Sequence, residues 1–246
     1  MATQLVWYKR DLRINDHAPM AEAAKAGCCV GLYVYEPEII EAEDFDAAHL
    51  DFINQSLIEL RENLRKRGGE LLLRTGRMPE VLEELHREIN FATLWAHEET
   101  FNGISYQRDR RVRAWAKTNA VPLTEIPQYG VVRRLKDRDG WAKQCANRMN
   151  QPIVAAPKQI QLPPEIKSLP PGAIQTRDSF QVHAFDRTNV QAGGESLAID
   201  CLDCKRTLKC MLTEILDFKI LEQRICRRVT RPLSGELGFL LVSKAT

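Results

Sequence analysis

Two kinds of apolar pattern alternate along the first 127 residues. Short, almost continuous apolar runs at residues 5–9, 29–35, 70–74, 93–96 and 121–126 are typical of strands buried on both faces. Between them, apolar residues recur every three or four positions, which indicates amphipathic helices at residues 18–25, 47–66, from 79 onward and 106–118. This alternation predicts an α/β fold with a five-stranded, doubly wound, parallel, Rossmann-like sheet.

Charged loops follow the first and fourth of these strands, at residues 9–16 and 97–102. If the strand order is the common 3-2-1-4-5 type, these two strands are neighbours and the chain reverses direction between them. Open α/β sheets bind their ligands at this reversal, beyond the carboxyl ends of the strands. The two loops are therefore expected to form a binding crevice. The alternative is that their charged residues only join the loops through salt bridges.

The side chains of the expected crevice suit a flat ring. They combine aromatic rings, which stack, with carboxylates and an amide, which accept hydrogen bonds from ring N–H groups. The set comprises Trp7, Tyr8, Tyr35, Glu36, Trp95, Glu98, Glu99, Asn102 and Tyr106. For the Trp and Tyr residues, a purely structural place in the core remains the alternative.

Several common site motifs are missing from the sequence. There is no GxGxxG, no GxxxxGK[ST] and no nucleophile elbow, so neither a phosphate cradle nor a Ser-His-Asp site has support. Cys201 and Cys204 form a CxxC without a second pair or nearby histidines, and His97-Glu98 lacks the second histidine of a zinc-protease helix, because position 101 is Phe. We expect no metal site and no catalytic residue in this chain.

Charge is unevenly spread although the net charge is only +2. Residues 1–99 hold 11 Lys and Arg against 19 Asp and Glu, whereas residues 100–246 hold 24 against 14. The basic half could face nucleic acid or be an ordinary solvated surface. No apolar run approaches the roughly 20 residues of a membrane helix, no signal peptide precedes the first strand, and the seven cysteines are scattered. These features predict a cytoplasmic chain with reduced thiols and no membrane partner.

The sequence changes character after the predicted sheet. We expect three parts: an α/β domain at 1–130, a basic and proline-rich linker at 131–192, and a short helical part at 193–246. Six prolines between 152 and 172 favour an extended linker over core. Gly193-Gly194-Glu195 opens a plausible helix, but from about Cys204 onward no helical or strand pattern is maintained.

Several stretches resemble the photolyase/cryptochrome family. Val6-Trp-Tyr-Lys-Arg10-Asp-Leu-Arg13-Ile-Asn-Asp16 is similar to the family's opening strand and R-D-L-R-x-x-D loop. Residues 95–102, 107–111 and 130–141 look like a bacterial subgroup, in which the loop after the fourth strand usually reads S-H-E-E-T-G-N. Phe101 replaces that glycine and is expected to crowd the crevice. The resemblance extends from residue 4 to about residue 203.

The resemblance implies an N-terminal antenna domain that holds a folate, a deazaflavin or a flavin. In the intact family a larger helical domain binds FAD, which drives light-dependent repair of pyrimidine dimers in DNA, a carbon–carbon lyase reaction. The resemblance and the expected crevice together indicate nine candidate cofactor-binding residues. They are Arg10, Asp11, Tyr35, Glu36, Glu98, Glu99, Asn102, Tyr106 and Asp109.

The sequence departs from the family near its end. Residues 230–246 do not match the helical domain, and no tryptophan follows Trp141 to form an electron relay. We expect a C-terminally truncated or frameshifted member that binds an antenna chromophore without catalysis, holds no FAD and contacts DNA weakly or not at all. The alternatives are a nucleotide- or flavin-binding module without photochemistry, and an inert gene remnant.

Overall fold

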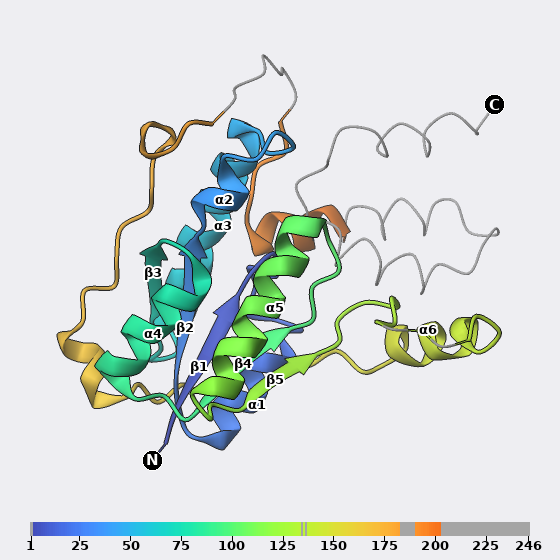
Figure 1. The fold of residues 1–246 in the computed structure, drawn as a ribbon, viewed down its shortest axis with the longest axis horizontal. Helices are drawn as coiled ribbons and strands as arrows, with labels where there is room; N and C mark the ends of the chain where they lie inside the picture. Colours follow the sequence, from blue (N-terminus) through green and yellow to red (C-terminus); the bar gives the residue numbers. More distant parts are fainter. Residues whose placement is uncertain (1, 134, 136, 183–189, 203–246) are drawn as a thin grey trace.

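The computed structural model describes residues 2–133, 135, 137–182 and 190–202 (Figure 1). The expectation of an aberrant tail from Cys204 falls outside the described residues. The helix expected after Gly193-Gly194-Glu195 begins as predicted, since residues 195–202 are helical.

One parallel sheet forms the centre of the molecule, and its strands have the order β3-β2-β1-β4-β5 (Figure 1). The strands are β1 (Thr3–Tyr8), β2 (Cys28–Tyr35), β3 (Leu71–Thr75), β4 (Thr93–His97) and β5 (Leu123–Ile126). All four strand pairs are parallel, and in the central pair Leu5 is in register with Leu94. The predicted α/β class and the five parallel strands are confirmed, and the strand order is the one on which the expected crevice depended.

The helices are α1 (Ala18–Ala26), α2 (Pro37–Ile40), α3 (Ala47–Arg65), α4 (Met78–Ile89), α5 (Gly103–Thr118) and α6 (Trp141–Met149). Helices α1 and α3 cover one face of the sheet, and α4 and α5 cover the other, whereas α6 lies away from the sheet (Figure 1). One apolar cluster joins the sheet to α1 and α3, with Met20 and Leu57 among its members, and the other joins it to α4 and α5, with Leu85 and Val112. Burial of the apolar faces of these four helices against the strands is the main apolar contribution to the stability of the fold. Within the described residues, no helix combines the length and the apolar character needed to cross a membrane.

The proline-rich segment is extended, as expected, but it packs along the α/β domain. Leu73 on the edge strand β3 donates its N–H to Pro171 O over 2.7 Å, and Ile160 donates to Arg67 O over 2.7 Å. Ile160 and Ile166 are buried, one in each apolar cluster. The segment thus covers the open edge of β3 and contributes to the core, which the linker expectation did not include.

The segment around Gly193 lies against α3. A Cβ atom on Gly193 would lie 2.1 Å from Phe52 O, so only glycine allows this approach. Glu195 then accepts hydrogen bonds from the backbone N–H groups of Ile14 (3.1 Å) and Asn15 (2.8 Å) in the loop after β1. Residues 193–195 therefore join α3 to that loop.

Candidate functional site

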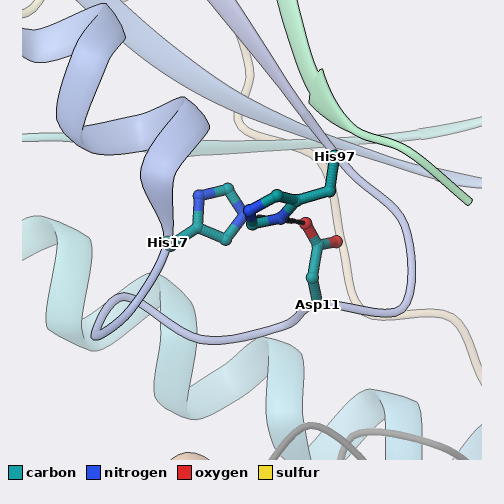
Figure 2. Close-up of side chains that lie close together, drawn as sticks. All are labelled: Asp11, His17 and His97. Atoms are coloured by element: carbon teal, nitrogen blue, oxygen red, sulfur yellow. Dashed lines mark hydrogen bonds and ion pairs between the residues drawn. The ribbon is translucent and has the colours of Figure 1, made fainter. Parts of the chain in front are cut away.

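The loops after β1 and β4 meet at a buried carboxylate, Asp11. Its Oδ2 accepts hydrogen bonds from His17 Nε2 at 2.9 Å and from His97 Nδ1 at 2.6 Å, and its Oδ1 accepts from Lys9 N at 2.8 Å. Figure 2 shows both imidazole rings turned toward the carboxylate. All three side chains are buried. The carboxylate therefore fixes the loop after β1 to the end of β4 and to the start of α1.

The protonation of this cluster follows from its contacts. Met20 N donates to His17 Nδ1 at 3.1 Å, so the His17 proton lies on Nε2 and points to Asp11. Burial alone would raise the pKa of the Asp11 carboxyl, but the neighbouring His17 and the hydrogen bonds from both imidazoles hold it well below 3.8. Burial lowers the pKa of His97 to about 3, and His17 adds to this effect. Asp11 is consequently stable as a carboxylate and His97 as a neutral imidazole.

The same three residues offer the donor atoms of a metal site, since their ligand atoms lie within 4.8 Å of one another. However, both imidazoles direct their hydrogens at one oxygen, Asp11 Oδ2, and the other nitrogen of His17 accepts from Met20 N. A metal ion would have to replace these hydrogen bonds in a fully buried position. The geometry fits a hydrogen-bond network better than a metal centre.

A second buried network is centred on Arg108 of α5. Its guanidinium donates to Glu36 Oε1 at 2.8 Å, to Asp109 Oδ1 at 3.0 Å and to Glu99 Oε2. Arg10 Nε donates to the other oxygen of Glu99 at 3.1 Å. Burial would lower the pKa of Arg108, but the three carboxylates raise it above its usual value. The network thus ties the ends of β1, β2 and β4 to α5.

A small cavity of about 50 Å³ lies between the end of β1, the end of β2 and α3. Arg10, Glu36, Glu99 and Arg108 form its polar side. Lys9 and Ser56 also line it, and the remaining side chains are apolar or aromatic, namely Tyr8, Leu12, Tyr33, Val34, Ile39, Ile40, Phe45, Phe52 and Ile53. The cavity therefore combines an apolar pocket with a charged rim.

Two polar atoms of the cavity wall are left unsatisfied. Tyr8 Oη and Glu36 Oε2 are buried and have no hydrogen-bond partner among the described residues. Burial is the largest cause that raises the pKa of Tyr8 well above 10.0, and the negative charge of Asp11 is the second. Burial raises the pKa of Glu36 to about 7, although Arg108 opposes the shift. Because buried polar groups are nearly always paired, this wall is suited to a polar ligand or an ordered water.

The structure brings together only part of the predicted site. Arg10, Glu36 and Glu99 line the cavity, and Asp109 lies behind them, bound to Arg108 and to Lys9. Asp11 forms the imidazole cluster beside a smaller hollow, which it lines with Arg10, Glu99 and Phe101.

The remaining predicted residues have other contacts. Tyr35 donates its hydroxyl to Asn54 at 2.7 Å, and Asn102 accepts from Ser105 N at the start of α5. Glu98 lies 3.7 Å from Arg148, and Tyr106 is half-exposed on α5. None of these four side chains lines the cavity.

The tryptophans named with the crevice lie outside the cavity as well. Trp7 belongs to the core and has the cations of Lys9 and Arg108 over its ring at 4.2 and 4.7 Å from the centroid. Trp95 packs against the other apolar cluster and donates to Gln4 Oε1 at 2.8 Å. Trp7 and Trp95 therefore have the structural place in the core that was the alternative to a role in the crevice.

Phe101 does crowd this region. Its ring lies against the Arg10 guanidinium, whose central carbon is 3.3 Å from the centre of the ring. The Phe101 side chain is 36% exposed. The contact is a stacked cation–π pair, which holds Arg10 at the rim between the cavity and the smaller hollow.

Arg108 and His17 are the central residues that the sequence reasoning missed. A signal for Arg108 exists, since the buried positions of α5 follow the helical period and include Arg108 and Asp109 with the apolar Val112. His17 lies directly before α1 and caps it, a position more often held by Ser, Thr, Asp or Asn.

Comparison with known proteins assigns this chain to a family. The family model described as DNA photolyase matches residues 4–134, more than half of the chain. The chain therefore belongs to the DNA photolyase family.

Individual relatives match over parts of their length. A cryptochrome DASH of Synechocystis sp. is 34% identical over 103 residues, which are 39% of this chain and 21% of that protein. The crystal structure of a Synechocystis cryptochrome superposes with a TM-score of 0.66 at 21% identity, over 83% of this chain and 46% of that one. An archaeal photolyase of Sulfolobus tokodaii, described as containing two FAD molecules with the implication of a novel light-harvesting cofactor, gives a TM-score of 0.64 at 14% identity, over 93% of this chain and 51% of that one. The chain thus corresponds to about half or less of these relatives.

Proposed function

We propose that this chain binds a small planar chromophore in the cavity at the ends of β1 and β2, as an antenna-type domain without catalytic activity of its own. The observation that carries the proposal is the pair of unsatisfied atoms, Glu36 Oε2 and Tyr8 Oη, on the wall of a cavity that combines apolar side chains with a charged rim. A ring N–H donating to Glu36 and a ring carbonyl accepting from Tyr8 would satisfy both. Folate, deazaflavin and flavin rings all carry such groups.

The volume of the cavity sets a condition on binding. About 50 Å³ holds one or two water molecules at roughly 30 Å³ each, whereas small-molecule sites measure roughly 300–1,000 Å³. The wall formed by Ile39, Ile40 and Phe45 belongs to the four-residue helix α2 and the segment before α3. Because so short a helix has few internal hydrogen bonds, displacement of residues 37–46 is the proposed route by which the cavity opens.

DNA binding by this chain is proposed to be weak or absent, because three arginines of its basic half are already paired with carboxylates. Arg111 pairs with Glu38, and both Arg113 and Arg133 pair with Glu125 at 2.6 and 3.1 Å. Exchanging these intramolecular pairs for phosphate contacts would gain little net attraction. A light-dependent repair assay on pyrimidine-dimer DNA is expected to show no repair.

Titration of the purified chain with FMN and with a reduced folate, followed by ligand fluorescence and visible absorption, tests the chromophore proposal. Above pH 7, where the Glu36 carboxyl is ionised, Glu36→Gln presents an amide in place of the free carboxylate oxygen and is expected to weaken binding about tenfold, the typical effect of losing one charge-assisted hydrogen bond. Glu80→Gln, at an exposed position on α4, is the matched control. Absence of binding by the wild-type chain, or equal binding by the Glu36 variant, would contradict the proposal.

A further inference from the structure

A second and larger hollow lies at the carboxyl ends of β4 and β5. It measures about 550 Å³, within the range of small-molecule sites, and is roofed by α6 and residues 151–154. Figure 1 shows α6 standing away from the sheet beyond β5. The hollow lies at the reversal between β1 and β4, because Arg13 follows β1 and His97 ends β4. This is the position where open α/β sheets bind ligands.

Arg13 is a buried cation with spare hydrogen-bonding capacity on the wall of this hollow. It is 6% exposed, and its Nη2 donates to Asp16 O at 2.8 Å and lies 3.9 Å from Asp16 Oδ2. Its Nη1 is buried and has no hydrogen-bond partner among the described residues. An unsatisfied guanidinium N–H in a buried position is costly, and an oxyanion is the partner that a guanidinium binds best.

A second guanidinium comes from α6. Arg148 lines the same hollow, donates from Nη1 to Val131 O at 2.6 Å and lies 3.7 Å from Glu98 Oε2. These contacts do not use all the N–H groups of the Arg148 guanidinium, so others are available to a ligand. The two arginines outnumber Asp16, the one acidic residue of the wall, which also accepts from Val154 N at 3.2 Å. The side chains that line the hollow are therefore net positive, and Glu98 lies beside Arg148 outside this lining.

The other polar and apolar groups narrow the ligand further. His97 uses Nδ1 for Asp11, so only Nε2 is available to a ligand, and its low pKa makes that nitrogen an acceptor for a hydroxyl group. Ile153 lines the hollow with 73% of its surface exposed, next to Ile126 and Pro127. An exposed aliphatic wall beside two guanidinium groups suits a ligand with an apolar body and a charged end.

We propose that this hollow binds a small organic oxyanion, a carboxylate or a phosphate monoester on an apolar body, with Arg13 and Arg148 on the oxyanion and Ile153 against the body. The site is distinct from the cavity proposed for the chromophore, which none of these three residues lines. Ligand binding here requires no displacement of the core.

Calorimetric titration of the full chain with phenyl phosphate and with benzoate tests this proposal, with benzyl alcohol as the neutral analogue. At least one of the two anions is expected to bind, and benzyl alcohol at least tenfold more weakly. Whichever of the two anions binds more tightly shows whether the hollow prefers a phosphate or a carboxylate group on its ligand. No binding of either anion at millimolar concentration would overturn the proposal. Inorganic phosphate binding as tightly as phenyl phosphate would overturn the role of the apolar wall.

Two substitutions assign the binding to this hollow. Arg148→Gln is expected to weaken anion binding about tenfold, whereas Arg110→Gln, an equal change of charge at an exposed position of α5, should not. Ile153→Glu introduces a carboxylate at an exposed position and is expected to abolish anion binding, whereas Ile58→Glu on α3, at 49% exposure, should not. Circular dichroism and the unfolding temperature show whether each variant folds. Anion affinity unchanged in both folded hollow variants would place the anion elsewhere and overturn the assignment.

Discussion

Replacing Glu36 with glutamine isolates the effect of one buried carboxyl on stability. Glu36 is 4% exposed, and burial raises its pKa from 4.5 to about 7 despite the neighbouring Arg108. The folded chain therefore keeps a proton on Glu36 over a pH range in which the unfolded chain has lost it. Because the folded state binds more protons in that range, the free energy of unfolding must fall as pH rises from about 4.5 to about 7.

The size of the effect follows from the shift. One pKa unit corresponds to about 1.4 kcal/mol, so a rise from 4.5 to about 7 corresponds to about 3 kcal/mol. Glutamine does not titrate but can still accept from Arg108 Nη1. The unfolding free energy of the wild-type chain minus that of Glu36→Gln is therefore expected to fall by about 3 kcal/mol across this window. It should be constant below and above it.

Urea unfolding followed by tryptophan fluorescence, at half-unit steps from pH 4 to pH 8.5, measures this difference. Glu80→Gln makes the same chemical change at an exposed position and should show no comparable trend. A wild-type-minus-variant difference that stays flat across the window, or rises with pH, would refute the reasoning. It would mean that Glu36 is ionised throughout and fully compensated by Arg108.

Two further substitutions test other contacts of the fold. Gly193→Ala would place a Cβ atom 2.1 Å from Phe52 O and is expected to destabilise the chain by about 1–3 kcal/mol and to speed proteolysis around residue 193, whereas Gly103→Ala, with nothing within 4 Å, should do neither. Asp11→Ala leaves the N–H groups of two buried imidazoles without their acceptor and should lower the unfolding free energy by about 3 kcal/mol or more, measured in urea beside the exposed-site control Asp139→Ala. A change of less than 1 kcal/mol in the Asp11 variant would show that water or rearrangement satisfies the imidazoles.

Much of the fold could be read from the sequence because the strands are continuous apolar runs separated by helices of regular period. The strand boundaries differ by one or two residues from those of the structure, as expected where strand ends fray into loops. Helix α2 has only four residues, too few to show a period. Helix α6 was missed because its buried surface amounts to one described residue, Met149.

The position of the site could be predicted from the sequence, but only some of the side chains that form it could. Polar loops after β1 and β4 identified the correct edge of the sheet, since topology brings those loops together. Whether a given carboxylate then lines a cavity depends on contacts more than 50 residues apart, such as those of Arg108 with Glu36 and of Asn102 with Asp44. Local patterns of residue type and spacing do not show which of these distant residues contact each other.

The path of the proline-rich segment has a consequence for dissecting this protein. Pro171 pairs with the outer side of β3, and Arg61 on α3 holds the same carbonyl at 3.0 Å. A recombinant fragment ending at residue 130 would leave that strand with free N–H and C=O groups, and strands in this state pair with one another between molecules. Fragments intended to remain monomeric should therefore extend beyond Gly172, and one that ends at residue 130 is expected to aggregate.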